Sequence, residues 1–151
     1  MVVIFSACTS IPTLPPVNGP SAEVEVSTST LKGRSVFYPD EKVSLVVFRM
    51  ADKTRLGGEE LTIQAPKKIL HLPAGTELQV RLFKSMALMG GMVSCLGEAA
   101  FNFDSEKRYR LIFNFDYNYN DPSSSTCVGA IETLDMSGLP ITKTPLTILA
   151  H

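Results

Sequence analysis

A two-residue alternation of apolar and polar side chains runs through most of the chain and constrains the fold more than any other feature. It is clearest from residue 109 to residue 119, where the odd positions are Tyr109, Leu111, Phe113, Phe115, Tyr117 and Tyr119, and the even positions are polar except Ile112. This alternation is typical of a β-strand that buries one face. At about 3.3 Å per residue the strand would exceed roughly 30 Å, so we expect its far end to outrun the core.

Further segments with strand character follow one another, with Gly, Pro, Asn, Asp and Ser between them. They are residues 22–27, 43–50, 61–64, 69–72, 78–82, 97–104, 128–134 and 142–149. Residues 84–89 are the one segment that suggests a helical turn. About eight short, mainly antiparallel strands without a long helical period predict an all-β domain, either a β-sandwich or an open barrel.

The size and charge of the chain exclude several classes of protein. A length of 151 residues fits one domain, and its 14 basic and 15 acidic residues are scattered along the chain. Scattered charge of this kind predicts no basic surface for nucleic acid. No apolar run approaches the roughly 20 residues that a membrane-spanning helix needs, so a membrane link would have to be an anchor.

The N-terminus carries the pattern of such an anchor. It reads Val2-Val3-Ile4-Phe5-Ser6-Ala7-Cys8, an apolar stretch that passes into small residues and stops at a cysteine. This resembles the bacterial lipobox, whose cysteine becomes the lipidated N-terminus of the mature protein. Ser6, Ala7 and Cys8 match the motif, whereas Phe5 stands where the family has a leucine-like residue.

The resemblance implies a division of the chain and an address for it. Residues 1–7 would be the remnant of a signal peptide, and Cys8 would carry acyl chains such as palmitate. Thr9, rather than aspartate, follows the cysteine, which implies the periplasmic face of the outer membrane. The proline-rich residues 8–21 are then expected to be an extended tether, and 22–151 the β-sandwich domain. The alternative is that this segment is an ordinary frayed N-terminus.

If Cys8 is the lipid site, Cys95 and Cys127 are left as a pair. An even number of cysteines in an exported protein predicts one disulfide. Closing the loop between them would stabilise the fold by roughly 3 to 4 kcal/mol on the chain-entropy model. The alternative is a pair of free thiols in a cytosolic protein.

Catalysis is not expected. Nucleophilic catalysis needs a base beside the nucleophile, and the only histidines are His71, within a strand segment, and His151, at the terminus. No pattern calls for a cofactor. The sequence therefore predicts a protein without enzymatic activity.

Two segments are candidates for binding. Tyr117 and Tyr119, at the end of the aromatic alternation, are candidates for an exposed platform that binds a glycan or a protein. Met86, Met89 and Met92 recur at a spacing of three, followed by Cys95. Methionines of this kind fill gaps or bind partners, but thioether ligands also select Cu(I).

The sequence thus predicts a lipid-anchored envelope module that binds a protein or glycan partner through residues 86–93 or 117–126. The alternative function is a periplasmic carrier of copper or of a small ligand, which would use Met86, Met89 and Met92 as its binding segment.

Overall fold

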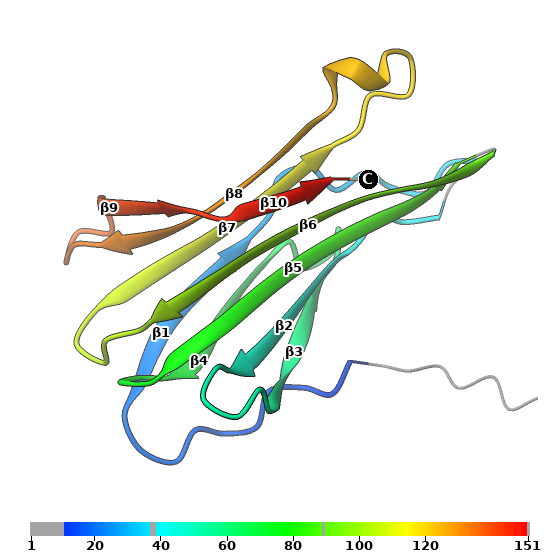
Figure 1. Ribbon diagram of the computed structural model, residues 1–151. Coiled ribbons are helices and arrows are strands. Elements are labelled where there is room, and N and C mark those ends of the chain that lie inside the picture. The colour runs from blue at the N-terminus through cyan, green and yellow to red at the C-terminus, as the bar shows by residue number, and fades with distance from the viewer. Residues whose placement is uncertain (1–10, 37–38, 89, 151) are drawn as a thin grey trace, which may run out of the picture.

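Figure 1 shows a computed structural model of the protein, which describes residues 11–36, 39–88 and 90–150. The described residues form ten strands and a single short 3-10 turn. The strands are β1 (Ser21–Ser27), β2 (Val43–Arg49), β3 (Arg55–Leu61), β4 (Lys67–Pro73), β5 (Glu77–Leu88), β6 (Gly91–Asn102), β7 (Arg108–Asp116), β8 (Thr126–Leu134), β9 (Pro140–Pro145) and β10 (Thr147–Ala150), and the turn is η1 (Pro122–Ser124).

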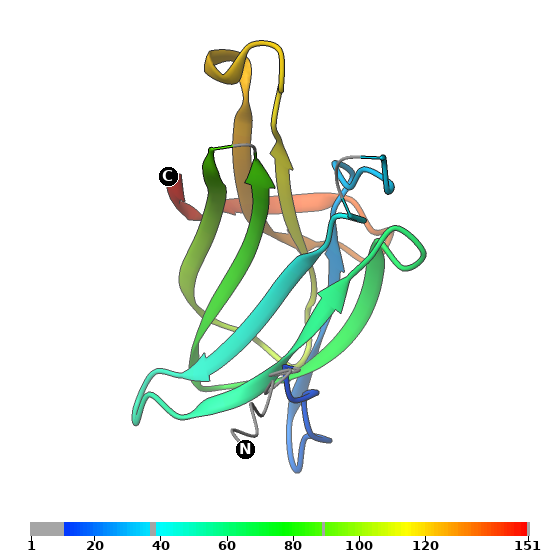
Figure 2. The same cartoon turned by 90° about the vertical axis from the view of Figure 1, so that its right-hand side faces the viewer.

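The strands form two five-stranded sheets that pack face to face (Figures 1 and 2). The first sheet has the order β4-β1-β7-β8-β9 and the second has the order β10-β6-β5-β2-β3. All neighbouring strands are antiparallel except β1 and β7, which are parallel. The predicted all-β sandwich is confirmed.

The core lies between the sheets and is made by one parity of each strand, as the alternation predicted. Val24, Val80 and Leu111, for example, are fully buried. Each strand therefore turns alternate apolar side chains toward the opposite sheet. The apolar surface removed from water in this layer is the main stabilising term of the fold.

Three of the expected boundaries are wrong. The helical turn predicted at residues 84–89 is not found in its described part, because β5 continues as a strand to Leu88. The strand expected at 61–64 lies earlier, at Arg55–Leu61, where Gly57 and Gly58 interrupt the apolar pattern. The strand expected at 142–149 is divided at Leu146 into β9 and β10.

The division at Leu146 carries the chain from one sheet to the other. β9 pairs with β8 in the first sheet, and β10 pairs with β6 in the second. Leu146 is buried at the crossing, and its N–H donates to the Gly129 carbonyl at 2.9 Å. A Cβ on Gly129 would lie 2.5 Å from Leu146 Cδ1, and one on Gly97 would lie 3.0 Å from it, so both glycines leave room for the Leu146 side chain at the crossing.

Candidate binding site at the loop end

Three connections gather at one end of the sandwich, which we call the loop end (Figures 1 and 2). They are the β1–β2 connection (residues 28–42), the distal half of the β5–β6 hairpin, and the β7–β8 loop (residues 117–125). Both segments that the sequence singled out for binding lie here. The strands of β5 and β6 extend to the loop end because the inward-facing alternation of β5 continues through Met86.

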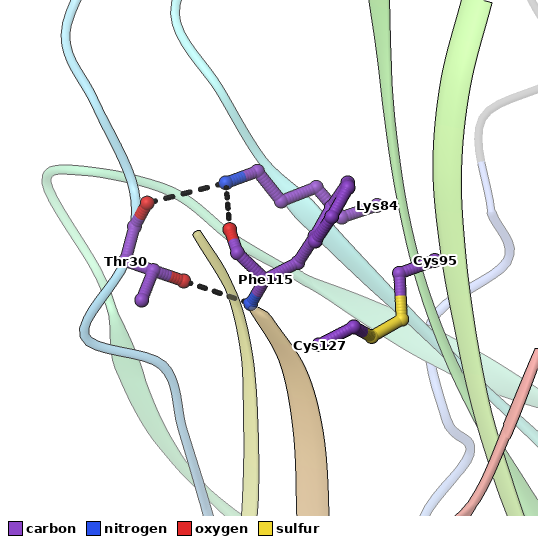
Figure 3. The surroundings of a disulfide bond; sticks show 5 residues. All are labelled: Thr30, Lys84, Cys95, Phe115 and Cys127. Carbon is purple, nitrogen blue, oxygen red and sulfur yellow. Dashed lines mark hydrogen bonds between the residues drawn. A yellow bond between two sulfur atoms is a disulfide. The ribbon is translucent and has the colours of Figure 1, made fainter. Parts of the chain in front are cut away.

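A buried lysine fixes the β1–β2 connection to both sheets. Lys84, on β5, points into the sandwich, and its side chain is 1% exposed. Its ammonium donates to the carbonyls of Phe115, at 2.8 Å, and Thr30, at 3.2 Å (Figure 3). It also lies 2.7 Å from the Glu41 carboxylate. These three acceptors match the three N–H groups of an ammonium, which is the condition for burying it.

Further hydrogen bonds fix two of the partners of Lys84, Thr30 and Glu41. The Thr30 hydroxyl accepts from the N–H of Phe115 at 3.0 Å, so that Thr30 contacts β7 through its side chain and Lys84 of β5 through its carbonyl. The Glu41 carboxylate, 7% exposed, also accepts from the N–H of Lys32 at 2.9 Å. We call Lys84, Glu41, Thr30 and Phe115 the clasp.

Cys95 and Cys127 join the two sheets beside the clasp. Their Cα atoms are 6.3 Å apart, within the range of a disulfide, and the bond links β6 to β8 (Figure 3). The predicted pairing of these cysteines is confirmed. Cys95 is the cross-strand partner of Lys84, and Cys127 is the cross-strand partner of Phe115. The disulfide and the clasp therefore lie in one layer across the sandwich.

Above this layer, the two predicted binding segments meet. The Tyr119 hydroxyl donates to Met86 Sδ at 3.7 Å, and the rings of Tyr117 and Tyr119 pack edge to face at 5.2 Å. Met86 is buried and Tyr119 is 38% exposed. The strand predicted over residues 109–119 ends earlier, at Asp116, so Tyr117 and Tyr119 lie in the loop that follows β7.

Two small pockets flank Tyr119. One, of about 160 Å³, lies against Met86 and is lined by Ser85, Ala87 and residues 39–42. The other, of about 340 Å³, is polar and is lined by Lys32, residues 116–120 and Ser124. The ammonium of Lys32 is 3.0 Å from the Asp116 carboxylate and 5.6 Å from the Tyr119 ring centroid, so it orders the wall of this pocket.

Met86 and Met92 point to opposite sides of the β5–β6 hairpin. Met92 is 68% exposed and is the cross-strand partner of Ala87, so it faces outward, whereas Met86 faces the interior. Met89 lies outside the described residues. The part of the chain that the structure describes holds no group of three His, Cys, Asp or Glu side chains that could hold a metal ion. No shared copper site is formed by Met86 and Met92.

The outer face of the first sheet is occupied by ion pairs that the sequence analysis missed. Glu25, Arg110, Glu132 and Lys143 are register partners on β1, β7, β8 and β9. Successive charged atoms are 3.1, 3.5 and 3.9 Å apart. Because the charges alternate in sign across four strands, each of these charged side chains has a partner of opposite charge. The loop end differs, since it exposes aromatic and apolar side chains.

Two carboxyl groups have a lowered pKa, and both lie in hairpin turns away from the loop end. The pKa of Asp52 is lowered because its carboxylate accepts from the N–H of Thr54. The pKa of Asp135 is lowered because its carboxylate accepts from the Ser137 hydroxyl and from the N–H of Leu139. Both groups are turn caps.

The remaining predicted residues are placed as follows. His71 is exposed on β4, and its cross-strand partner Glu23 lies near the start of β1, whereas the loop end lies beyond the end of β1. Cys8 and His151 lie outside the described residues. Within the described residues, no helix has the length and apolar character to span a membrane.

Searches of protein-family models, of curated proteins and of solved structures found no match to this chain. A functional assignment therefore depends on the sequence and on the geometry of the loop end.

Proposed function

We propose that the protein is a non-catalytic binding or assembly module of the cell envelope. Lipid on Cys8 anchors it to the periplasmic face of the outer membrane, and its loop end binds a protein or glycan partner. The contact between Met86 and Tyr119, which joins two independently predicted segments into one surface, is the observation that carries this proposal.

The construction of the loop end supports a binding role. Binding residues are commonly held on loops that a rigid scaffold positions. Here the clasp and the disulfide immobilise the bases of all three connections, while Tyr119 and Met92 stay exposed above them. Tyrosine combines a large apolar ring with a polar tip and is enriched at interfaces for that reason. A rigid aromatic group loses little conformational entropy when it binds.

The cysteine pair supports the address. Disulfides persist in oxidising compartments such as the bacterial periplasm and are rare in the cytosol. The Cys95–Cys127 bond therefore fits an exported protein, which the lipobox-like residues Ser6, Ala7 and Cys8 also favour.

The address is tested by the intact mass of the protein expressed with its native upstream region in a bacterial host, with and without reduction. We expect a mature species that begins at Cys8 with added acyl mass, and a gain of two hydrogens on reduction. An unprocessed chain with three free thiols would contradict the proposed address.

The binding surface is tested with two matched variants of the full chain. Tyr119→Ala removes the exposed ring of the loop end, and His71→Ala removes an exposed ring from β4. The probes are an envelope protein cross-linked to the protein in cells and purified peptidoglycan. Because aromatic anchors contribute about 2 kcal/mol or more, we expect Tyr119→Ala to weaken binding of one probe about 30-fold. Equal binding by both variants would exclude Tyr119 from the interface.

A further inference from the structure

The segment that precedes β1, residues 11–20, packs against the sandwich. The Pro12 carbonyl accepts from the N–H of Gly58 at 2.8 Å, and Thr13 forms a parallel bridge with Gly58 on the outer edge of β3. At the other end of this segment, the Pro20 carbonyl accepts from the N–H of Ala74 at 3.0 Å. We call residues 11–20 the docked linker. It passes from the edge of the second sheet to β1 in the first.

β3 is shaped to receive this linker. Gly57 has φ +143°, a conformation that side chains with a Cβ rarely adopt, and a Cβ there would lie 2.8 Å from the Thr13 carbonyl oxygen. A Cβ on Gly58 would clash first with the Leu45 carbonyl oxygen of β2, and it would also lie 2.7 Å from Ile11 Cγ2. Leu14 is partly buried and packs against the core. Gly57 therefore makes room for the linker, whereas Gly58 is required by the neighbouring strand as well as by the linker.

We propose that the docked linker holds the β3 edge of the domain against the lipid bilayer, at a short and fixed distance. This inference rests on the proposed anchor at Cys8. The chain from Cys8 to Ile11 spans three residues, which reach at most about 11 Å when fully extended. A flexible tether over residues 8–21 would instead average about 20 Å between its ends and would let the domain tumble.

The docking also sets the place of the loop end. Gly58 lies in one cross-strand row with Val46 on β2 and Arg81 on β5, and β5 continues to Leu88. Seven further residues along β5 correspond to about 23 Å. The loop end is therefore displaced along the strands from the attachment point, and β9, on the opposite side of the sandwich, is held away from the bilayer (Figure 1).

The first experiment measures docking without the membrane. The N–H of Gly58 lies on the outer edge of β3 and is protected by the linker, so its hydrogen exchange reports docking directly. Leu14→Asp should release the linker and raise the exchange rate of this amide about 10-fold or more. Asn18→Asp places the same charge at an exposed position of the linker and should leave the rate unchanged. Equal rates in wild type and Leu14→Asp would overturn the docking.

The second experiment uses the lipidated full chain in phosphatidylglycerol vesicles, after intact mass has confirmed acylation. One fluorophore is attached through Arg55→Cys on β3 and, in a separate sample, through Thr142→Cys on β9, both exposed positions. A quencher in the lipid headgroups should quench the β3 label at least twofold more than the β9 label, and Leu14→Asp should abolish the difference. Equal quenching in the acylated wild type would overturn the inference. Absence of acylation would instead overturn the proposed anchor and leave the exchange result intact.

Discussion

Replacing Lys84 by methionine tests the clasp directly. Methionine keeps most of the aliphatic stem that packs between the sheets but removes the ammonium. The Glu41 carboxylate, 7% exposed, would then keep the N–H of Lys32 as its donor within the described part of the chain, and the carbonyls of Phe115 and Thr30 would each lose a charged partner.

The size of the effect follows from this geometry. Removing one member of a buried ion pair costs about 3 to 5 kcal/mol, because the other charge stays buried without compensation. Domains of this kind have a total stability of about 5 to 15 kcal/mol, so Lys84→Met should remove a large fraction of it. With a urea slope of about 2 kcal/mol per molar, the unfolding midpoint should fall by about 2 M.

Urea unfolding followed by circular dichroism measures this change, and Lys42→Met is the matched control. Lys42 also pairs with a glutamate, Glu60, at 2.8 Å, but its side chain is 59% exposed. Exposed pairs contribute about 0 to 1 kcal/mol, so the control should unfold almost as the wild type does. The double variant Lys84→Met, Glu41→Gln should recover part of the loss, since it removes the stranded charge. If Lys84→Met and Lys42→Met had equal effects, the buried clasp would be refuted.

Three further predictions concern other parts of the fold. Gly129→Ala should destabilise the protein by about 1 to 3 kcal/mol through overpacking, and adding Leu146→Ala should relieve the clash; additive losses in urea unfolding would contradict this. Arg110→Met should cost about 1 kcal/mol at low salt and less at high salt, because it interrupts the ion-pair ladder; a salt-independent loss would point to packing instead. Ser137→Ala should raise the pKa of Asp135 toward the ordinary value of an aspartate in an NMR titration, because the side-chain hydrogen bond from Ser137 is the largest cause of the lowered pKa. Because the folded pKa of Asp135 is depressed, its stabilising contribution is present above the unfolded pKa and is lost as pH falls through the folded pKa; an unchanged titration would show that the Ser137 hydroxyl is not its partner.

The alternation predicted most strands, because a strand that buries one face carries apolar residues at every second position. It failed where another requirement overrode parity. Gly57 and Gly58 carry no side chain to show a pattern, because Gly57 lies against residues 13 and 14 and Gly58 lies against the backbone of β2 as well as Ile11. Pro145 directly before Leu146 is a local sign that a strand ends there, but it does not indicate that the chain changes sheets.

The binding segments were predictable, but their meeting was not. Met86 and Tyr119 each stood out by composition, whereas their contact depends on the packing of β5 against β7, which a single sequence does not give. Lys84 did carry a signal. It continues the inward-facing series of Leu78, Val80 and Leu82, so parity alone places a lysine in the core, where it needs a partner. Its partner Glu41 lies in a connection without periodicity.

From the register of the strands we predict that the clasp and the disulfide stabilise the fold cooperatively. Because Lys84 faces Cys95 and Phe115 faces Cys127, one disulfide fixes the spacing between the sheets at the level where the ammonium reaches the Phe115 carbonyl. Without the disulfide, β6 and β8 can separate, and the ammonium should lose part of that contact.

Lys84→Met should therefore cost less in a background with both cysteines replaced by alanine than in the wild type. Coupled neighbours show interaction energies of about 0.5 to 3 kcal/mol, so a double-mutant cycle in urea should resolve a difference of about 1 kcal/mol or more. Lys42→Met, whose ion pair is exposed, should cost the same in both backgrounds. If the loss of unfolding free energy caused by Lys84→Met were the same with and without the disulfide, the clasp and the disulfide would stabilise the loop end independently. Their position in one layer would then have no energetic consequence.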